Sequence, residues 1–508
     1  MTAVETAPSA PAPEAGGLGR PRWAGLASVL RLAGAHRWFG LALAAGLVVR
    51  AVAVLGYWPA LWFNDSFEYV GVALRLQPYP IRPDGYSFYL RALEPLHSFR
   101  LVVITQHLMG LGVAVLLYAL LRRWGVPGWL ATLGSLPQLL DVHQVQLESL
   151  ILSDTLFTAL LVAAVTLLGW RARPSWRLAG AAGLLLALAT LTRSVGLPLL
   201  LLAGLYLLVR RPGWRAAAAF GVLAAAPVAG YATWYHSVHG QYALSSSEGI
   251  FLYSRVMQFA DCATIHPPAD LAGLCDPRPP ADREPSSNYI WRSSPLDRVT
   301  GSYSPVDGAP PQRFTPRANE AARQFAVRAI LAQPGDYLRL VGRDLLRGLA
   351  WEREPFPNAG VLAGYEFTLE PKKTTMGLSD GPGRPERQVD RVFVPGGTAR
   401  GDTAAYEANP ADTAVVQPFA DMIIGYQRVA FLPGPVLAAV VLLGLAGVLA
   451  ARRRDPRRWP ALLLWGVSAA LLVLPPATAQ FDYRYLLPAV PLAAAAAALA
   501  GPMLRRRG

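Results

Sequence analysis

The chain has 508 residues, of which 53% are hydrophobic and only 16% are charged, and its formal net charge is +14. This composition excludes a string of ordinary soluble domains, because the apolar residues are concentrated in long blocks. The positive charge does not indicate a nucleic-acid partner, since the arginines stand in short clusters beside apolar blocks and not along one polar face. The sequence therefore predicts a chain whose main solvent is lipid.

Ten apolar segments predict transmembrane helices. The longer ones approach the roughly 20 residues that a helix needs to cross a hydrocarbon core of ~30 Å. The ten ranges are 39–57, 101–121, 126–142, 148–169, 178–191, 195–209, 216–235, 429–450, 459–476 and 485–502. We therefore expect an all-α polytopic membrane protein with about ten spans.

Arginine clusters predict the orientation of these helices. The clusters at 122–123, 171–177, 210–215, 452–458 and 505–507 fall on one side of the predicted membrane, together with the arginines of the N-terminal segment. Basic residues favour the cytoplasmic side, so both termini are predicted to lie inside. Abundant Arg, Ala, Gly and Pro are typical of a GC-rich bacterial genome, which predicts a multi-pass protein of the bacterial inner or plasma membrane.

This orientation divides the chain into four regions. We predict a disordered cytoplasmic tail at 1–37, an N-terminal transmembrane module at 38–235 with a first outer loop at 59–100, an extracytoplasmic domain of helices and loops at 236–428, and transmembrane helices with a cytoplasmic tail at 429–508. Inside the outer domain, residues 318–351 have helical spacing on both sides of Pro334-Gly335, which predicts two amphipathic helices.

Both cysteines of the chain, Cys262 and Cys275, belong to the predicted outer domain. An oxidising compartment permits a disulfide there, and the closed loop would be short. The alternative is a pair of free thiols. Two cysteines without paired histidines make a poor zinc site, so no metal ligands are predicted.

The first outer loop begins with an acidic residue at a predicted helix start. Asp65 directly follows an apolar segment and precedes the helical pattern SFEYVGVALRL. A carboxylate at this position can act as a general base, although an aspartate at a helix start is often only its cap. Glu68 and Tyr69 lie three and four residues further on and share its side of the helix, so we consider them candidate substrate-binding residues.

A second acidic segment, DVHQVQLESLILSDTLF, joins two predicted membrane helices. Ionisable residues at this depth usually face a polar cavity, so Asp141 or Glu148 are candidates to join Asp65 in a substrate site. The alternative is a hydrated turn with helix caps. Glu148 and Asp154 are six residues apart and do not share one helix face, which argues against a paired-carboxylate device.

Arginines at the outer side are the candidate cations. Arg193 stands in LTRSVGLP, Arg255 in GIFLYSRVMQF, and Arg484 follows Tyr483 in FDYRYLLPAVPL. Each arginine alone is explained by snorkelling to the membrane interface. Together they would supply the charge that holds a phosphate or pyrophosphate in an apolar-walled region, with Tyr483 as a further substrate-binding candidate.

In their order along the chain, the Asp65 loop, LESLILSDTLF, TRSVGLPLLL and DYRYLLPAVPL resemble the GT-C superfamily of membrane glycosyltransferases, which includes protein O-mannosyltransferases and the lipid A aminoarabinose transferase. The resemblance covers 38–260 and 420–503. It implies a polyprenyl-phosphate sugar donor and an inverting transfer with Asp65 as the base. Several relatives carry two adjacent acids where this chain has Asn64-Asp65-Ser66, so a divalent cation stays open.

The position of the site leads to the same chemistry. Soluble nucleotide sugars are not expected outside the cytoplasm, so an activated sugar must arrive attached to a lipid. The acceptor is left open among a polysaccharide, a glycolipid and a protein. The alternative function is a transporter or flippase of lipid-linked intermediates, for which the sequence shows no inverted repeat.

Overall fold

The structure is a computed structural model that describes residues 23–292, 294–300, 313–374, 376–378, 387–452 and 454–504. Most of the tail predicted at 1–37 lies outside the described residues. Its last part is helical, however, because α1 runs from Trp23 to Gly56. The segment after Pro21 has no further proline and is rich in Ala and Leu, which favours a helix that continues into the first apolar block.

A helix lies in each of the ten predicted membrane ranges. These helices are α1, α4 (Phe99–Arg123), α5 (Gly128–Leu140), α7 (Asp154–Gly169), α8 (Trp176–Thr192), α9 (Gly196–Arg210), α10 (Trp214–His239), α20 (Gly434–Ala450), α21 (Arg458–Thr478) and α22 (Ala489–Leu504). Among the described residues, five segments are long and apolar enough to cross a membrane: His36–Gly56, Phe99–Arg123, Trp214–His239, Arg458–Thr478 and Tyr483–Leu504. Helices α7, α8, α9 and α20 are apolar but shorter. The predicted all-α polytopic fold is confirmed.

The chain between α5 and α7 differs from its prediction. A separate helix, α6 (Val142–Ser149), lies between them, and α7 begins at Asp154 instead of residue 148. The break forms because the extended backbone of residues 149–151 pairs with Leu61: Leu61 N donates to Ser149 O at 3.0 Å, and Ile151 N donates to Leu61 O at 3.2 Å. These two backbone hydrogen bonds connect the first outer loop to the second acidic segment.

The first outer loop is folded and covered by distant parts of the chain. It contains β1 (Tyr57–Trp58), α2 (Asn64–Arg75), α3 (Gly85–Leu93) and the 3₁₀ turn η1 (Glu94–Leu96). β1 pairs antiparallel with β4 (Ala414–Val415), and α18 (Ala399–Glu407) packs against α2. The N-cap of α2 is Phe63, whose N–H donates to Ser66 Oγ at 2.9 Å. Asp65 is therefore in the first turn, and the reading of Asp65 as the cap is corrected.

The rest of the predicted outer domain consists of short helices, turns and one small hairpin. Its elements are α11 (Glu248–Val256), α12 (Cys262–Ile265), η2 (Ala272–Leu274), η3 (Pro280–Asp282), α13 (Ser286–Trp291), α14 (Asp297–Thr300), α15 (Pro316–Ala332), α16 (Pro334–Gly348), α17 (Ala359–Ala363), the hairpin of β2 (Met376–Leu378) and β3 (Arg387–Val389), and α19 (Phe419–Gln427). Helices α15 and α16 are the two predicted around Pro334, and a disulfide joins Cys262 to Cys275.

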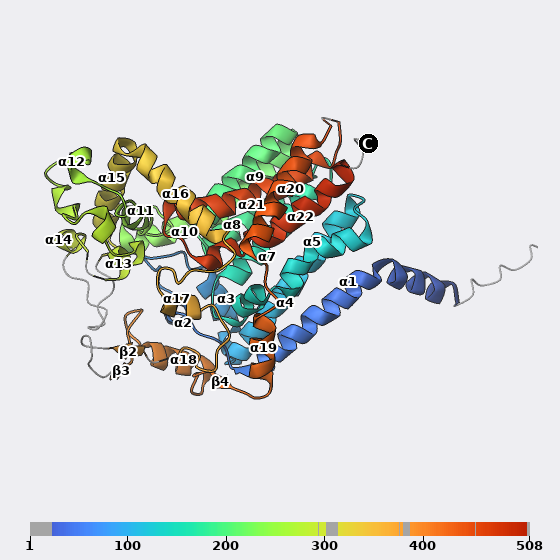
Figure 1. The fold of residues 1–508 in the computed structure, drawn as a ribbon, viewed down its shortest axis with the longest axis horizontal. Helices are drawn as coiled ribbons and strands as arrows, with labels where there is room; N and C mark the ends of the chain where they lie inside the picture. The colour runs from blue at the N-terminus through green and yellow to red at the C-terminus, as the bar shows by residue number, and fades with distance from the viewer. Residues whose placement is uncertain are drawn as a thin grey trace, which may run out of the picture.

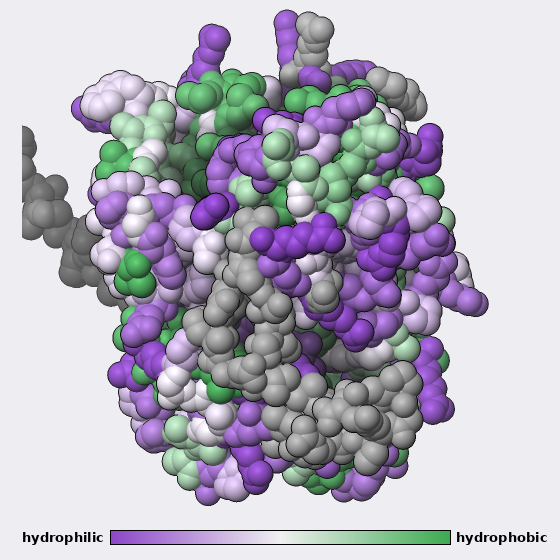
Figure 2. All heavy atoms as spheres, turned by 90° about the vertical axis from the view of Figure 1, so that its left-hand side faces the viewer, coloured by the Kyte–Doolittle hydropathy of each residue, from purple (hydrophilic) through white to green (hydrophobic). Residues whose placement is uncertain are grey.

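The elements separate into two ends (Figure 1). The long helices α4, α5 and α20 to α22 form one side of the molecule, whereas α11 to α15 lie together at the opposite end. That opposite end presents mainly hydrophilic residues to the viewer in Figure 2. Its core is formed by apolar side chains of α11, α13 and α15, including Tyr253, Ile290 and Phe325. Asp65 of α2 lines one cavity together with residues of α11 and α13 and residues of α9 and α21, so it lies where the two ends meet.

Candidate functional site

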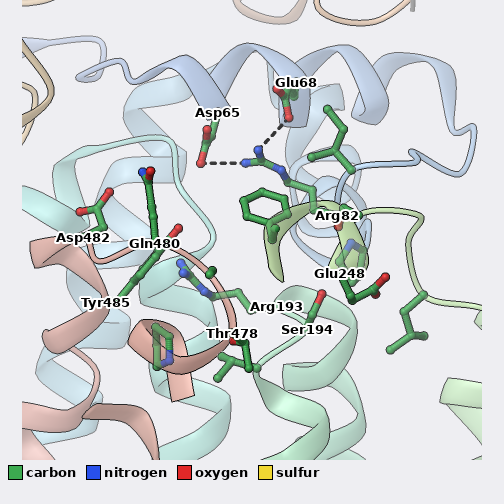
Figure 3. A pocket seen from close by; sticks show the side chains of 18 of the residues that line it. Asp65, Glu68, Arg82, Arg193, Ser194, Glu248, Thr478, Gln480, Asp482 and Tyr485 are labelled. Carbon is green, nitrogen blue, oxygen red and sulfur yellow. Dashed lines mark ion pairs between the residues drawn. The ribbon is translucent and has the colours of Figure 1, made fainter. Parts of the chain in front are cut away.

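A cavity of about 1420 Å³ lies beside the start of α2. Apolar residues from α9, α10 and α21, among them Leu197, Val228 and Leu474, line one part of it. Charged and polar side chains line another part, and Figure 3 shows that they come from α2, from the loop after α2, from the α8–α9 turn and from the segment after α21. The cavity therefore joins an apolar wall to a cluster of charges.

Asp65 is buried in this cluster between two guanidinium groups. Its Oδ2 atom lies 2.7 Å from Arg82 Nη1 and 2.7 Å from Arg484 Nη2. Burial alone would raise the pKa of Asp65, but the two arginines outweigh it and hold this pKa well below its usual range. Asp65 is therefore an anion in this arrangement, and the two arginines weaken it as a base.

Arg484 has N–H groups that are not used in hydrogen bonds among the described residues. It is only 8% exposed, yet its Nη1 and Nε atoms have no hydrogen-bond partner among the described residues. Asp482 is a further acidic neighbour, and its Oδ2 is 3.9 Å from Nε. Buried N–H groups normally have partners, so these donors indicate a place for an oxyanion at the surface of the cavity.

Arg82 connects Asp65 to Glu68. Its Nη2 atom lies 3.0 Å from Glu68 Oε2, and its guanidinium is 5.3 Å from the centre of the Tyr69 ring. Tyr69 is held in place through a 2.9 Å hydrogen bond between its hydroxyl and Ser153 Oγ. Burial raises the pKa of Glu68 to about 7, and the nearby Asp65 adds to the rise while Arg82 opposes it. The structure thus brings together the three candidates that the sequence placed on one side of α2.

Arg193 reaches the same cavity from the α8–α9 turn (Figure 3). It forms an ion pair with Asp154 at the start of α7, and its guanidinium is 5.1 Å from the centre of the Tyr485 ring. Because Asp154 and Tyr485 hold this guanidinium beside the apolar wall, Arg193 and Arg484 provide positive charge at the cavity from two different elements.

Glu148, a predicted substrate-binding candidate, does not line the cavity, and we leave it out of the proposed site. It is buried between α1, α4 and α5, where it accepts hydrogen bonds from Arg50 Nε at 2.7 Å, Arg50 Nη2 at 2.8 Å, His107 at 2.9 Å and Gln138 at 3.1 Å. A Cβ at Gly110 would overlap Glu148 Oε1, so the glycine makes room for this cluster. The break after α6 turns Glu148 into the helix bundle.

Asp141, Arg255 and Tyr483 also lie outside the cavity lining, and we leave them out of the proposed site. Asp141 caps α6, as the alternative interpretation expected: it accepts from His143 N at 2.8 Å and from Leu432 N at 3.1 Å. Arg255 is buried against Asp344 in an ion pair of 2.5 Å. Tyr483, at the start of the 3₁₀ turn η4 (Tyr483–Leu486), packs edge-on against Phe481 at 4.9 Å between ring centres.

Arg82, Asp482 and Gln480 are among the cavity residues that the sequence analysis missed. Arg82 stands in the proline-flanked loop PIRPDGY, where a charged residue without helical spacing gave no periodic signal. Asp482 precedes Arg484 by two residues and accepts hydrogen bonds from Tyr365 Oη at 2.8 Å and Arg484 N at 3.1 Å. Gln480 lines the cavity, and its Oε1 is buried without a partner among the described residues. The repeated acidic and basic residues of FDYRY were the only signal for this segment.

The described residues contain no group of three or more His, Cys, Asp or Glu side chains that could hold a metal ion. Two carboxylates of the cavity, those of Asp65 and Glu68, are bridged by the Arg82 guanidinium, with contacts of 2.7 and 3.0 Å. The guanidinium therefore already supplies the positive charge between these two acids.

No family model matches the sequence, and no curated protein matches it. The structure is similar to those of three membrane glycosyltransferases. The protein O-mannosyltransferase Pmt1–Pmt2 complex of S. cerevisiae, bound to its sugar donor, gives 17% identity and a TM-score of 0.33 over 42% of this chain and 36% of that chain. ArnT from Cupriavidus metallidurans, bound to undecaprenyl phosphate, gives 14% identity and a TM-score of 0.34 over 93% of this chain and 78% of that chain.

The oligosaccharyltransferase of Archaeoglobus fulgidus gives 13% identity and a TM-score of 0.36 over 92% of this chain and 51% of that chain. The chain thus spans about one third of the O-mannosyltransferase and about half of the oligosaccharyltransferase. All three TM-scores lie below 0.5, so the function proposed below rests on the cavity of this chain.

Proposed function

We propose that the protein is a membrane glycosyltransferase that moves a sugar from a polyprenyl-phosphate donor to an acceptor hydroxyl on the extracytoplasmic side of the membrane, with inversion at the anomeric carbon. The observation that carries the proposal is the position of Arg484. Its unpartnered N–H groups and the Asp65 carboxylate lie together in one cavity that also has an apolar wall. A lipid phosphate needs both a cation and an apolar surface, and the acceptor needs a base.

The proposed reaction assigns one role to each side of the charge cluster. The acceptor hydroxyl gives its proton to Asp65, and its oxygen forms a bond to the anomeric carbon. The bond between that carbon and the phosphate oxygen breaks, and the electron pair leaves with the polyprenyl phosphate. Arg484 and Arg193 stabilise the negative charge that develops on the departing phosphate. Attack opposite to the leaving group accounts for inversion.

The two arginines on Asp65 make donor binding part of its activation. In the structure the carboxylate is paired at 2.7 Å with both Arg82 and Arg484, which keeps its proton affinity low. A donor phosphate that takes hydrogen bonds from Arg484 withdraws part of this positive charge from Asp65. The proton affinity of Asp65 then rises only when the donor is present, so the base becomes effective when it is needed.

The test is transfer from a panel of radiolabelled polyprenyl-phosphate sugars by the purified full-length protein in detergent. We expect release of label from at least one donor, with free polyprenyl phosphate as the second product, and loss of this release in Asp65→Asn. A proteoliposome assay for movement of the same lipids across the bilayer is run beside it. Translocation without release of label would contradict the proposal and establish the transport alternative.

A further inference from the structure

Two basic residues of the segment after α17 lie near the start of α2, on a part of the chain other than the helices α9, α10 and α21 whose residues form the apolar wall. Arg391 lines the cavity, and Lys372 lies behind Phe63 and Asn64, which also line it. The segment after Arg391 is fixed over α2, because Phe393 packs on Phe67 with 5.4 Å between ring centres.

Neither residue has a carboxylate partner. The Lys372 ammonium donates to Asn64 Oδ1 and lies 5.8 Å from the centre of the Phe63 ring. Arg391 Nε is buried and has no hydrogen-bond partner, and no ion pair involves Lys372 or Arg391 among the residues that the structure describes. A half-buried ammonium near a half-buried guanidinium is an unfavourable arrangement unless an anion joins them.

The electrostatics of Lys372 agree with this geometry. Burial lowers the pKa of Lys372 to about 8, the neighbouring Arg391 lowers it further, and the Asp65 carboxylate opposes both. The hydrogen bond to Asn64, the residue before Asp65, places Lys372 at the same end of α2 as the proposed base. The guanidinium of Arg484 also lies near Phe63, 5.1 Å from the centre of its ring. Cations from two separate segments of the chain therefore lie around Phe63.

We propose that Lys372 and Arg391 form a second oxyanion site, which binds a phosphate or carboxylate group of the acceptor while Arg484 and Arg193 bind the donor phosphate. This assignment rests on the proposed function, because it takes the apolar wall beside Arg484 as the place of the donor lipid. It narrows the acceptor to molecules that carry an anionic group close to the hydroxyl that receives the sugar.

The lysine content of the chain permits a direct test. Lys372 and Lys373 are its only lysines, and Lys373 is exposed next to the proposed site. Reductive methylation with ¹³C-formaldehyde gives one NMR signal for each lysine and one for the N-terminal amine, and Lys373→Arg assigns them. Inorganic phosphate and acetate are then added to the full-length protein at constant ionic strength. We expect a saturable shift of the Lys372 signal and a rise of the Lys372 pKa, while the Lys373 signal stays in place.

Two variants and one competitor complete the experiment. Arg391→Gln should weaken the response of Lys372 to phosphate about tenfold, the effect of removing one charged hydrogen-bond donor. Arg343→Gln, on the exposed surface of α16, should leave it unchanged. Undecaprenyl phosphate, added first, should leave the response to phosphate intact. Equal, unsaturable shifts of both lysine signals would overturn the anion site, and loss of the response after undecaprenyl phosphate would overturn its assignment to the acceptor.

The result is separate from the test of catalysis, because the NMR signals report anion binding whether or not a sugar is transferred. A saturable response in a protein that transfers no sugar would leave the anion site in place and contradict the proposed function. Sugar transfer by a protein whose Lys372 signal does not respond to anions would support the proposed function and contradict the anion site.

Discussion

Two buried groups of carboxylates and arginines in this protein differ in how completely they are satisfied. Glu148 accepts hydrogen bonds from three side chains inside the helix bundle and does not line the cavity beside α2. Asp65 shares Oδ2 between two arginines, and one of these, Arg484, keeps two buried nitrogens without partners. A closed network stabilises the bundle, whereas an incomplete one has capacity left for a ligand. Burial of a charge alone does not distinguish the two.

The largest expected effect is on catalysis at Asp65. Asp65→Asn removes the proposed base while keeping the shape of the side chain, and the rate of sugar transfer should fall about 10²- to 10⁴-fold. The dissociation constant for the donor should stay the same or decrease, because Arg484 loses a competing carboxylate. Single-turnover kinetics and donor binding measured on the same preparation separate these quantities. A variant that turns over normally would remove Asp65 from the role of base.

The corresponding change at Glu148 should act on stability. Glu148→Gln leaves the Arg50 guanidinium buried without its carboxylate, and breaking a buried ion pair in this way costs about 3–5 kcal/mol. We expect a lower thermal midpoint in detergent, followed through the intrinsic tryptophan fluorescence. The activity of the fraction that remains folded should be close to that of the wild type. A stable Glu148→Gln protein with greatly reduced transfer would contradict the separation of the two clusters.

The same contrast explains how far the sequence could predict the site. Periodicity and apolar length identified the helices, because a membrane span leaves a long local signal. The signal that placed Asp65, Glu68 and Tyr69 on one side of α2 was also local in the sequence, since it depends only on helical spacing. The position of Glu148 in the structure depended on the pairing of Leu61 with the chain after α6, and this is a contact between residues far apart in the sequence. Nothing in LESLILSDTLF indicates that the helix breaks there.

Arg82 is a case in which the sequence analysis missed a residue of the site, again because its position depends on tertiary packing. It lies in a loop without periodicity, and it enters the site only because the chain returns after α2 to place its guanidinium between Asp65 and Glu68. Arg255 was predicted on the same grounds as Arg193 and Arg484, yet Asp344 from α16 neutralises it. All three arginines pair with a carboxylate, and tertiary packing decided which of them also line the cavity.

Arg484→Gln should have the next largest effect. It removes the cation with the unpartnered donors, and loss of one such group from a preorganised site lowers the rate about 10²- to 10³-fold. Donor binding should weaken as well, which distinguishes this variant from Asp65→Asn. Arg255→Gln is the matched control, because that arginine is equally buried but lies outside the cavity lining. If Arg255→Gln impaired donor binding as strongly in a folded protein, the donor phosphate would not be assigned to Arg484.

The smallest expected effect is a pH dependence of donor binding that comes from Glu68. Burial raises the pKa of Glu68 to about 7, so this carboxyl is mostly neutral at pH 6 and mostly ionised at pH 8. Ionised Glu68 attracts Arg82 more strongly and competes with a nearby phosphate for positive charge, whereas the phosphodiester of the donor does not titrate in this range. The donor dissociation constant should therefore increase about two- to fivefold between pH 6 and pH 8, which corresponds to an ion pair of about 0.5–1 kcal/mol. Glu68→Gln should abolish this dependence while leaving the affinity near its value at pH 6, and an unchanged pH profile in that variant would assign the titration to another group.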